Sequence, residues 1–134
     1  MMAFVADNSV VLAWFVSSQS TAYSEKMLRR VAREPIHVPV VWSLEFSNAL
    51  RQLERRRKLK PDATAELLDA VDALGLQSDV SPPGQRRLLD LARQYDLSVY
   101  DASYLELAIR LTVPLATQDG PLAAAATKAG LKAD

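Results

Sequence analysis

The alternation of short apolar runs with helical patterns is the feature that most constrains the fold of this chain. Runs rich in β-branched and aromatic residues at 3–7 ("AFVAD"), 36–40 ("IHVPV") and 113–118 ("VPLATQ") predict strands. Residues 76–80 ("LQSDV") and 131–134 ("LKAD") are candidates for a brief strand and a final edge strand. Because helical segments separate these runs, we expect a parallel sheet covered by helices on both faces.

Apolar residues at helical spacing predict the helices between these strands. The expected helices cover residues 8–15, 22–33, 42–58, 62–74, 85–95, 101–111 and 121–130. In the second helix we expect Met27, Leu28 and Val31 to face the core. We interpret residues 97–99 as a loop or an extended segment, so that Asp101 opens the sixth helix.

The length and the composition exclude several classes of protein. A chain of 134 residues has the length of one ordinary domain, and we expect residues 1–134 to form it. The absence of cysteine excludes disulfides and thiolate metal ligands and fits a reducing compartment. The single histidine, His37, lies in a predicted strand, so zinc sites and Ser-His catalysis would depend on it alone.

The charge balance and the N-terminal residues exclude further classes of protein. Lys and Arg number 16 and Asp and Glu also 16, so contact with nucleic acid must depend on a local basic patch. Residues 1–16 are apolar, but an acid and an asparagine interrupt them and no basic segment precedes them, so we expect neither a signal peptide nor a membrane span. We therefore interpret the protein as cytoplasmic.

Acidic residues stand at the ends of predicted strands. Asp7 follows the first strand, Asp119 follows the strand at 113–118, and Asp101 opens the helix before that strand. Ligands of open α/β sheets bind beyond the carboxyl ends of the strands, so these side chains can meet there. Glu45 lies on the long third helix at the edge of an apolar stripe, in a polar row with Asn48.

Each acid also has an ordinary structural interpretation. An aspartate just before a helix commonly caps it, for about 1 kcal/mol, and this reading applies to Asp101 and Asp119. Asp7 is a weaker cap candidate, because Asn8 or Ser9 can serve instead. A glutamate on a helix is usually solvated.

Taken together, the four acids favour a cation site. Two carboxylates about 4 Å apart repel by roughly 1 kcal/mol in water and about 4 kcal/mol at an effective dielectric of 20. The flanking stretches "FVADNS", "SLEFSN", "VYDASY" and "ATQDGP" contain no lysine or arginine that would neutralise them. A set of oxygen ligands favours the hard ions Mg²⁺ and Mn²⁺, and such ions suit phosphodiester hydrolysis without a catalytic histidine.

Four segments of the chain resemble, in order, the PIN-domain ribonucleases. They are "FVADNSVVLAWF", "VPVVWSLEFSNAL", "LSVYDASYLELAIRL" and "VPLATQDGPL", and the third is the most specific. The closest resemblance is to the VapC-type toxins of bacterial toxin-antitoxin pairs. It implies an α/β fold: one three-layer α/β/α PIN-like nuclease domain with a central, mostly parallel sheet of four to five strands. The tail "AGLKAD" is shorter than in many relatives, so the sequence does not decide whether a fifth strand forms.

The resemblance also implies site residues, cofactors and partners. It maps the family's catalytic, metal-binding acids onto Asp7, Glu45, Asp101 and Asp119, of which Asp7 and Asp101 match the direct ligands. The supporting polar residues are Ser9, Asn48 and Thr117. The family implies Mg²⁺- or Mn²⁺-dependent cleavage of an RNA substrate, a homodimer, and a cognate antitoxin of a type II pair that covers the active-site groove.

A basic cluster ends the third helix, in "RQLERRRKLK". Cations at this end complement the helix dipole and keep the surface soluble. The functional alternative is contact with RNA phosphates or with an acidic antitoxin segment through Arg51, Arg55 and Arg56. Helix geometry places the cluster roughly 15 Å from Glu45, so it would hold flanking substrate.

The aromatic residues near the acids have two interpretations each. Trp14 and Phe15 are expected in the core, or else in an apolar groove for a partner peptide. We expect Tyr100 to pack beside Asp101 and position it, in preference to stacking on a base.

Two other functions have to be weighed against a nuclease. A catalytically silent PIN-fold protein-binding module would use its acids as helix caps and its surface for a partner. A phospho-accepting receiver domain would carry an adjacent acidic pair after the first strand, where this chain has "DNS", and a lysine after a late strand, where it has "ATQDGP". The sequence therefore disfavours a receiver domain.

Overall fold

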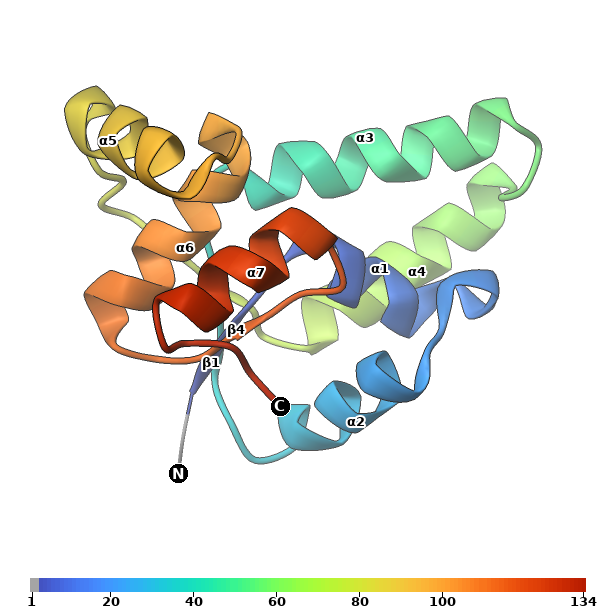
Figure 1. Cartoon of the computed structure of the whole chain (residues 1–134). Helices are drawn as coiled ribbons and strands as arrows, with labels where there is room; N and C mark the ends of the chain where they lie inside the picture. Colours follow the sequence, from blue (N-terminus) through green and yellow to red (C-terminus); the bar gives the residue numbers. More distant parts are fainter. Residues whose placement is uncertain (1–2) are drawn as a thin grey trace.

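The computed structural model describes residues 3–134 and shows a four-stranded sheet enclosed by helices (Figure 1). The strands are β1 (Phe4–Ala6), β2 (Ile36–Val38), β3 (Gln77–Ser78) and β4 (Leu115–Ala116). Neighbouring strands are parallel, in the order β3-β2-β1-β4. The ends of β1 and β4 therefore lie side by side, although more than a hundred residues separate them along the chain.

Helices connect the strands and follow the predicted order. They are α1 (Asn8–Phe15), α2 (Ala22–Val31), α3 (Trp42–Arg55), α4 (Pro61–Ala73), α5 (Gln85–Tyr95), α6 (Val99–Leu111) and α7 (Gly120–Lys128). A short 3₁₀ turn, η1 (Ser17–Gln19), links α1 to α2. Within residues 3–134, no helix combines the length and the apolar character that a bilayer crossing requires.

The alternation of side chains along β1 separates two cores. Phe4 and Ala6 point to one face of the sheet and pack with residues of α1, α2, α3 and α4. Val5 points to the other face and packs, with Leu115 of β4, against α6 and α7. Helix α5 covers α6 through Leu91. The result is the three-layer α/β/α architecture that the sequence predicts.

The C-terminal segment reaches the sheet for only one residue pair. Leu115 of β4 donates its N–H to the carbonyl of Leu131 (2.6 Å) and accepts from the N–H of Ala133 (3.0 Å). These bonds form an isolated parallel bridge between Leu115 and Lys132. The candidate edge strand at 131–134 thus lies beside β4 and is reduced to this bridge.

Several local expectations are wrong, among them the ends of α2 and α7, which both come two residues earlier than expected. Helix α6 begins at Val99 and not at Asp101, because the Ser98 side chain caps it by accepting from the Asp101 N–H (3.1 Å). Leu28 is 38% exposed, since the neighbouring Met27 is the residue of α2 that enters the core. Helix α3 ends at Arg55 and not at residue 58, and Arg57 beyond it adopts a left-handed conformation with φ 58°.

Candidate active site

Asp7 lies directly after β1 and caps α1. Its carboxylate accepts hydrogen bonds from the Val10 N–H (3.1 Å) and from the hydroxyls of Ser9 (2.6 Å) and Thr117. Burial raises the pKa of this carboxyl, and the hydrogen bonds from Ser9 and Thr117 act in the opposite direction. The expectation that Asn8 or Ser9 is the better cap is wrong, because Ser9 donates to Asp7 instead.

The hydroxyl residues join the ends of β1 and β4. Ser9 accepts the N–H of Gln118 (3.1 Å), and Thr117 accepts the N–H of Asp119 (3.0 Å) while it donates to Asp7. Both of these supporting residues therefore contact Asp7. They hold it in one orientation, since each hydroxyl is itself fixed by a backbone group.

Asp119 follows β4 and caps α7. One oxygen of its carboxylate accepts the Leu122 N–H at 3.0 Å. The capping interpretation of this residue is thus confirmed. A cap engages only part of a carboxylate, so the other oxygen is free of this hydrogen bond and can serve a further ligand.

Asp101 is not a cap. Within residues 3–134 its carboxylate accepts no hydrogen bond and forms no ion pair, although it is partly buried. Its pKa is raised to about 6, first by burial and then by the charges of Asp119, Glu45 and Asp7. The structure thus brings the four predicted acids into one electrostatic neighbourhood.

Glu45 joins this neighbourhood from the first turn of α3. It accepts a hydrogen bond from the hydroxyl of Tyr104 in α6 (2.6 Å). A surface pocket of about 270 Å³ lies beside it and is lined by Val41, Leu44, Glu45, Asn48 and Tyr100. Asn48 therefore shares a pocket wall with the glutamate, as its spacing in the sequence predicts.

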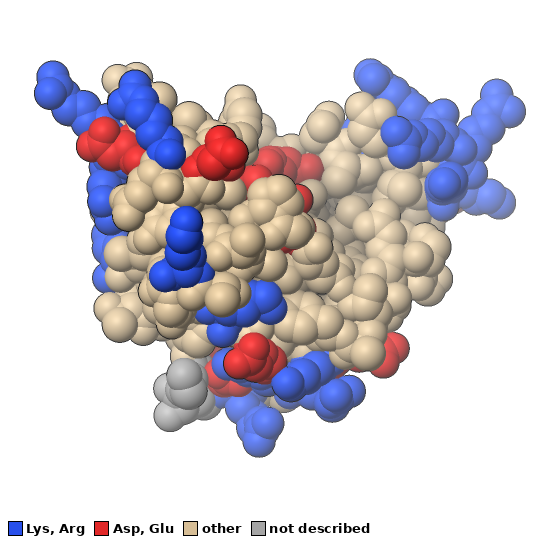
Figure 2. All heavy atoms as spheres, in the orientation of Figure 1, with Lys and Arg blue, Asp and Glu red and all other residues tan. Residues whose placement is uncertain are grey.

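The chemistry of the donors fits a hard divalent cation. Figure 2 shows acidic side chains in the hollow between α3 and the helices on the α5 side. In the part of the chain from residue 3 to 134, the ion pairs all lie elsewhere, so none neutralises these four acids. Carboxylate and hydroxyl oxygens surround the hollow, and no thiol or imidazole contributes, which suits Mg²⁺ or Mn²⁺.

The four carboxylates do not form a closed cage. Residues 3–134 contain no set of three or more acidic or histidine side chains already arranged to hold one ion. An open arrangement of carboxylates can still bind magnesium, because Mg²⁺ usually keeps several waters and takes only one or two carboxylates directly. Asp7 and Asp101 are then the candidates for direct contact, and Glu45 and Asp119 for contact through water.

Of the two tyrosines near Asp101, Tyr104 and not Tyr100 is the packing residue. Tyr100 is 61% exposed, so it is not a buried packing residue. Tyr104 is 1% exposed and was missed as a residue of the site. The available signal is its position three residues after Asp101, since residues three apart lie on one face of a helix.

The basic cluster lies away from the acids. Arg51, Arg55 and Arg56 are exposed at the far end of α3, where Figure 2 shows basic side chains gathered apart from the hollow. Arg51 pairs with Glu54 of the same helix (3.3 Å). This placement agrees with a role outside the reacting centre.

The expected packing of Trp14 and Phe15 against the core is confirmed. They belong to α1 and pack, partly buried, against the core. They also line a pocket of about 270 Å³ together with Glu25 and Leu28 of α2.

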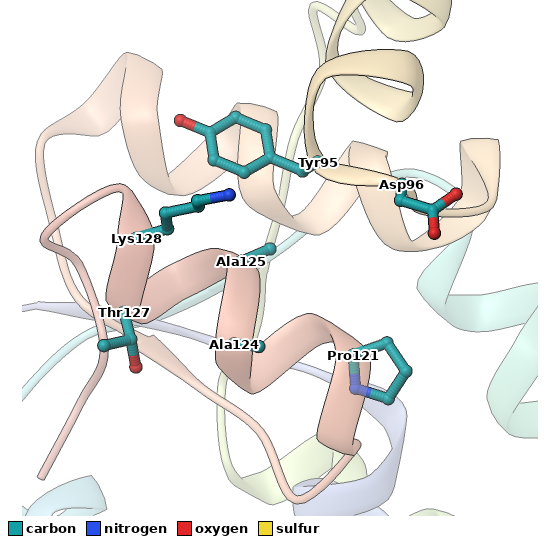
Figure 3. Close-up of a pocket in the computed structure, with 7 residues that line it drawn as sticks. All are labelled: Tyr95, Asp96, Pro121, Ala124, Ala125, Thr127 and Lys128. Carbon is teal, nitrogen blue, oxygen red and sulfur yellow. The ribbon is translucent and has the colours of Figure 1, made fainter.

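Another pocket, of about 440 Å³, lies between the end of α5 and α7 (Figure 3). It is lined by Tyr95, Asp96, Pro121, Ala124, Ala125, Thr127 and Lys128. None of the four predicted acids is among them. We therefore place the chemistry in the hollow beside α3 and not in this larger pocket.

Comparisons with known proteins identify the family and the fold of this chain. The family described as "PIN domain" matches residues 4–128. Two proteins named "Ribonuclease VapC1", from Mycobacterium tuberculosis strains CDC 1551 / Oshkosh and ATCC 25618 / H37Rv, are each 33% identical over 102 residues, 74% of this chain and 74% of theirs. A crystal structure of PAE2754 from Pyrobaculum aerophilum superposes with a TM-score of 0.70 at 24% identity, covering 92% of this chain and 79% of that one, and shows the same fold.

Proposed function

Because the chain belongs to the PIN-domain family and to its VapC-type ribonucleases, we propose that it is a metal-dependent endoribonuclease and the toxin of a type II toxin-antitoxin pair. The observation that carries this proposal is Asp101. It is a partly buried carboxylate with a raised pKa, three acids nearby and no cation from residues 3–134 beside it. Such a group is stabilised by an external cation.

In this mechanism the chain's residues have distinct tasks. Asp7, fixed by Ser9 and Thr117, would hold the ion together with Asp101. Glu45 and Asp119 would orient the attacking water and accept its proton. The ion, when bound, supplies a more acidic water and stabilises the charge that develops on the phosphate.

Purified protein and an RNA substrate test the proposal. We expect the protein to cleave RNA in the presence of Mg²⁺ or Mn²⁺. Cleavage should stop when a chelator removes the ion and should return when Mn²⁺ is added in excess. Asp7→Asn keeps a capping side chain and is expected to remain folded without cleaving. Sequencing the RNA ends after brief expression of each protein would identify the target.

A silent binding module is the rival outcome of this experiment. Such a module would release no saturable heat when titrated with Mn²⁺ and would leave RNA intact at every metal concentration. Saturable heat that disappears in Asp7→Asn, together with metal-dependent cleavage, would exclude it.

The basic end of α3 supports an RNA contact outside the cleavage site. We place RNA phosphates on Arg51, Arg55 and Arg56, whose exposed guanidinium groups suit phosphate oxygens. The double variant Arg55→Gln/Arg56→Gln is expected to bind RNA more weakly and to reduce the slope of log affinity against log salt by about 0.7 per lost contact. An unchanged slope would favour an acidic antitoxin segment as the partner of this cluster.

We propose that the cognate antitoxin binds the pocket between α1 and α2, whose lining combines apolar residues with serines and Glu25. Trp14, Phe15 and Leu28 line the pocket there, and a helical or extended peptide with apolar side chains suits such a surface. Trp14→Ala is expected to weaken binding of the antitoxin, measured by calorimetry. The control Tyr95→Ala, in the pocket between α5 and α7, should leave that affinity unchanged.

A homodimer is supported by a group of exposed apolar side chains. They come from the segment before α3, the first turn of α3, the segment after β3 and the start of α6, and are Val40, Leu44, Val80, Val99 and Tyr100. Monomeric proteins rarely leave a large contiguous apolar surface exposed. Sedimentation should show a dimer for the wild type and a monomer for Leu44→Glu. We assign the protein to the cytoplasm, where its RNA substrate would be found.

A further inference from the structure

Tyr104 connects two helices that carry acids of the site. It belongs to α6, and its phenolic hydroxyl donates to the Oε1 atom of Glu45 in α3 at 2.6 Å. The two residues are 59 positions apart in the sequence. The bond therefore fixes the relation between helices that the chain does not join directly.

Packing explains the ring of Tyr104 but not its hydroxyl. The ring is 1% exposed and packs among Val5, Leu105 and other residues of the core beneath α6 and α7. A phenylalanine would fill nearly the same volume. A buried hydroxyl needs a hydrogen-bond partner, and within residues 3–134 Glu45 is the partner present. The polar atom is thus accounted for by its contact with the glutamate.

Glu45 depends on this contact for its orientation. In the described chain its carboxylate forms no ion pair, and the Tyr104 hydroxyl is the donor that it has. A glutamate side chain on a helix surface otherwise samples several rotamers. A hydrogen bond to an ionised carboxylate is roughly twice as strong as one between neutral groups, so it selects one of them.

Helix α6, which carries Tyr104, also carries Asp101. Asp101 and Tyr104 are three residues apart on α6 and therefore lie on one face of it. The position of α6 thus sets where Asp101 lies and, through the hydroxyl, where Glu45 lies. One rigid element controls the separation of two carboxylates that belong to different helices.

We propose that Tyr104 is a positioning residue, which holds the Glu45 carboxylate beside Asp101 in the orientation needed for metal-dependent RNA cleavage. The inference rests on the proposed function, because it assigns Glu45 a task in that reaction. Tyr104 itself touches neither substrate nor ion.

Tyr104→Phe removes the hydroxyl and keeps the ring. We expect kcat for RNA cleavage to fall about tenfold and Mn²⁺ binding, followed by calorimetry, to weaken about tenfold, with the KM for RNA unchanged. Tyr95→Phe is the control, since it also removes a tyrosine hydroxyl but lies in the pocket between α5 and α7, which none of the four acids lines. The control should leave kcat and Mn²⁺ affinity within twofold of the wild type. Circular dichroism would verify that both variants are folded.

A double-mutant cycle with Glu45→Ala separates positioning from general stability. If the hydroxyl acts through the glutamate, Tyr104→Phe should change neither kcat nor Mn²⁺ affinity once Glu45 is absent. Effects that multiply in the double variant would overturn the proposal, because they would show that Tyr104 acts independently of Glu45. An unaltered kcat and Mn²⁺ affinity in Tyr104→Phe alone would overturn it as well.

The failure of the proposed function gives a different result. A wild-type protein that neither binds Mn²⁺ nor cleaves RNA would overturn both proposals together. If the wild-type protein binds Mn²⁺ and cleaves RNA, but the effects of Tyr104→Phe and Glu45→Ala multiply in the double variant, only the proposed role of Tyr104 is overturned.

Discussion

Helix α6 takes part in two groups of acids that differ in their counter-charge. Toward its C-terminal end, Arg110 binds Asp79 (2.6 Å) and Glu106 (2.9 Å), whose side chains are 10% and 6% exposed. Near its N-terminal end, Asp101 has no such partner in the described chain. The pKa values move accordingly, because Arg110 lowers that of Asp79 whereas burial and neighbouring acids raise that of Asp101 to about 6.

The contrast distinguishes a structural ion-pair group from a candidate cation site. A carboxylate that meets a guanidinium is already satisfied and joins elements of the fold, here α6 to the end of β3. A partly buried carboxylate surrounded only by other acids is unsatisfied until a cation arrives. Acid content alone therefore does not identify the site, whereas the missing counter-charge does.

The largest effect is expected from Asp101→Asn, which removes a charge from the unpaired group. RNA cleavage should fall by about 10³-fold or more, the order found when a group that stabilises transition-state charge is lost. The paired counterpart, Asp79→Asn, should cleave within twofold of the wild type. Equal activity of Asp101→Asn and the wild type would contradict the site assignment.

A smaller effect is expected when the paired group is broken. Arg110→Met leaves two largely buried carboxylates without their cation and should lower the free energy of unfolding by about 2 kcal/mol. This is less than for a fully buried pair, because the Arg110 side chain is 34% exposed. Urea unfolding measures it, and an unchanged midpoint would show that the ion pairs contribute nothing.

The pH dependence of stability should have opposite signs in the two groups. The pKa of Asp101 is higher in the folded protein, so between pH 4 and 6 the folded state binds more protons. Metal-free protein should therefore lose stability as the pH rises through this window, by on the order of 1 kcal/mol after screening by solvent. Asp101→Asn should remove this loss.

For Asp79 the pKa is lowered on folding, so its contribution to stability is present above about pH 4 and is lost as the pH falls below that value, through the lowered pKa of the folded protein. Asp79→Asn should flatten the acid side of the profile and leave the range from pH 4 to 6 unaltered. Thermal unfolding across pH 3 to 8 compares the two variants, and identical profiles would remove the distinction between the groups.

The smallest effect is expected from an ion pair in neither group. Asp90 and Arg93 of α5 lie 3.7 Å apart, and both side chains are 72% exposed. Arg93→Gln should change the free energy of unfolding by less than about 0.5 kcal/mol, because solvent screens such a pair. A larger change would show that the exposed fraction of the side chains does not predict how much these ion pairs contribute to the free energy of unfolding.

Element types were predictable from the sequence, whereas one boundary near the site was misplaced. Six helix starts match the expected positions within one residue, but α6 begins at Val99, before Asp101. The signal was present, since Ser98 stands three residues before an acid and this spacing is typical of a helix start. The apolar Leu97 and Val99 beside it led to an extended interpretation.

The candidate site was predictable in its residue types but not in its contacts. The positions of Asp7 and Asp119 after strands follow from the alternation of elements, and both lie there. The burial of Tyr104 and the exposure of Tyr100 were not predictable, because both are aromatic neighbours of Asp101 and only the packing of α6 against the sheet distinguishes them.

The sequence by itself determined the layered α/β architecture and the acids available to it, because periodicity and residue type depend on near neighbours along the chain. The tertiary structure decided which acids are satisfied. Arg110 binds Asp79, which is 31 positions away in the sequence, and Tyr104 donates to Glu45, which is 59 positions away. Such pairings depend on the order of the strands and on the faces that the helices turn to each other, and no local pattern encodes either.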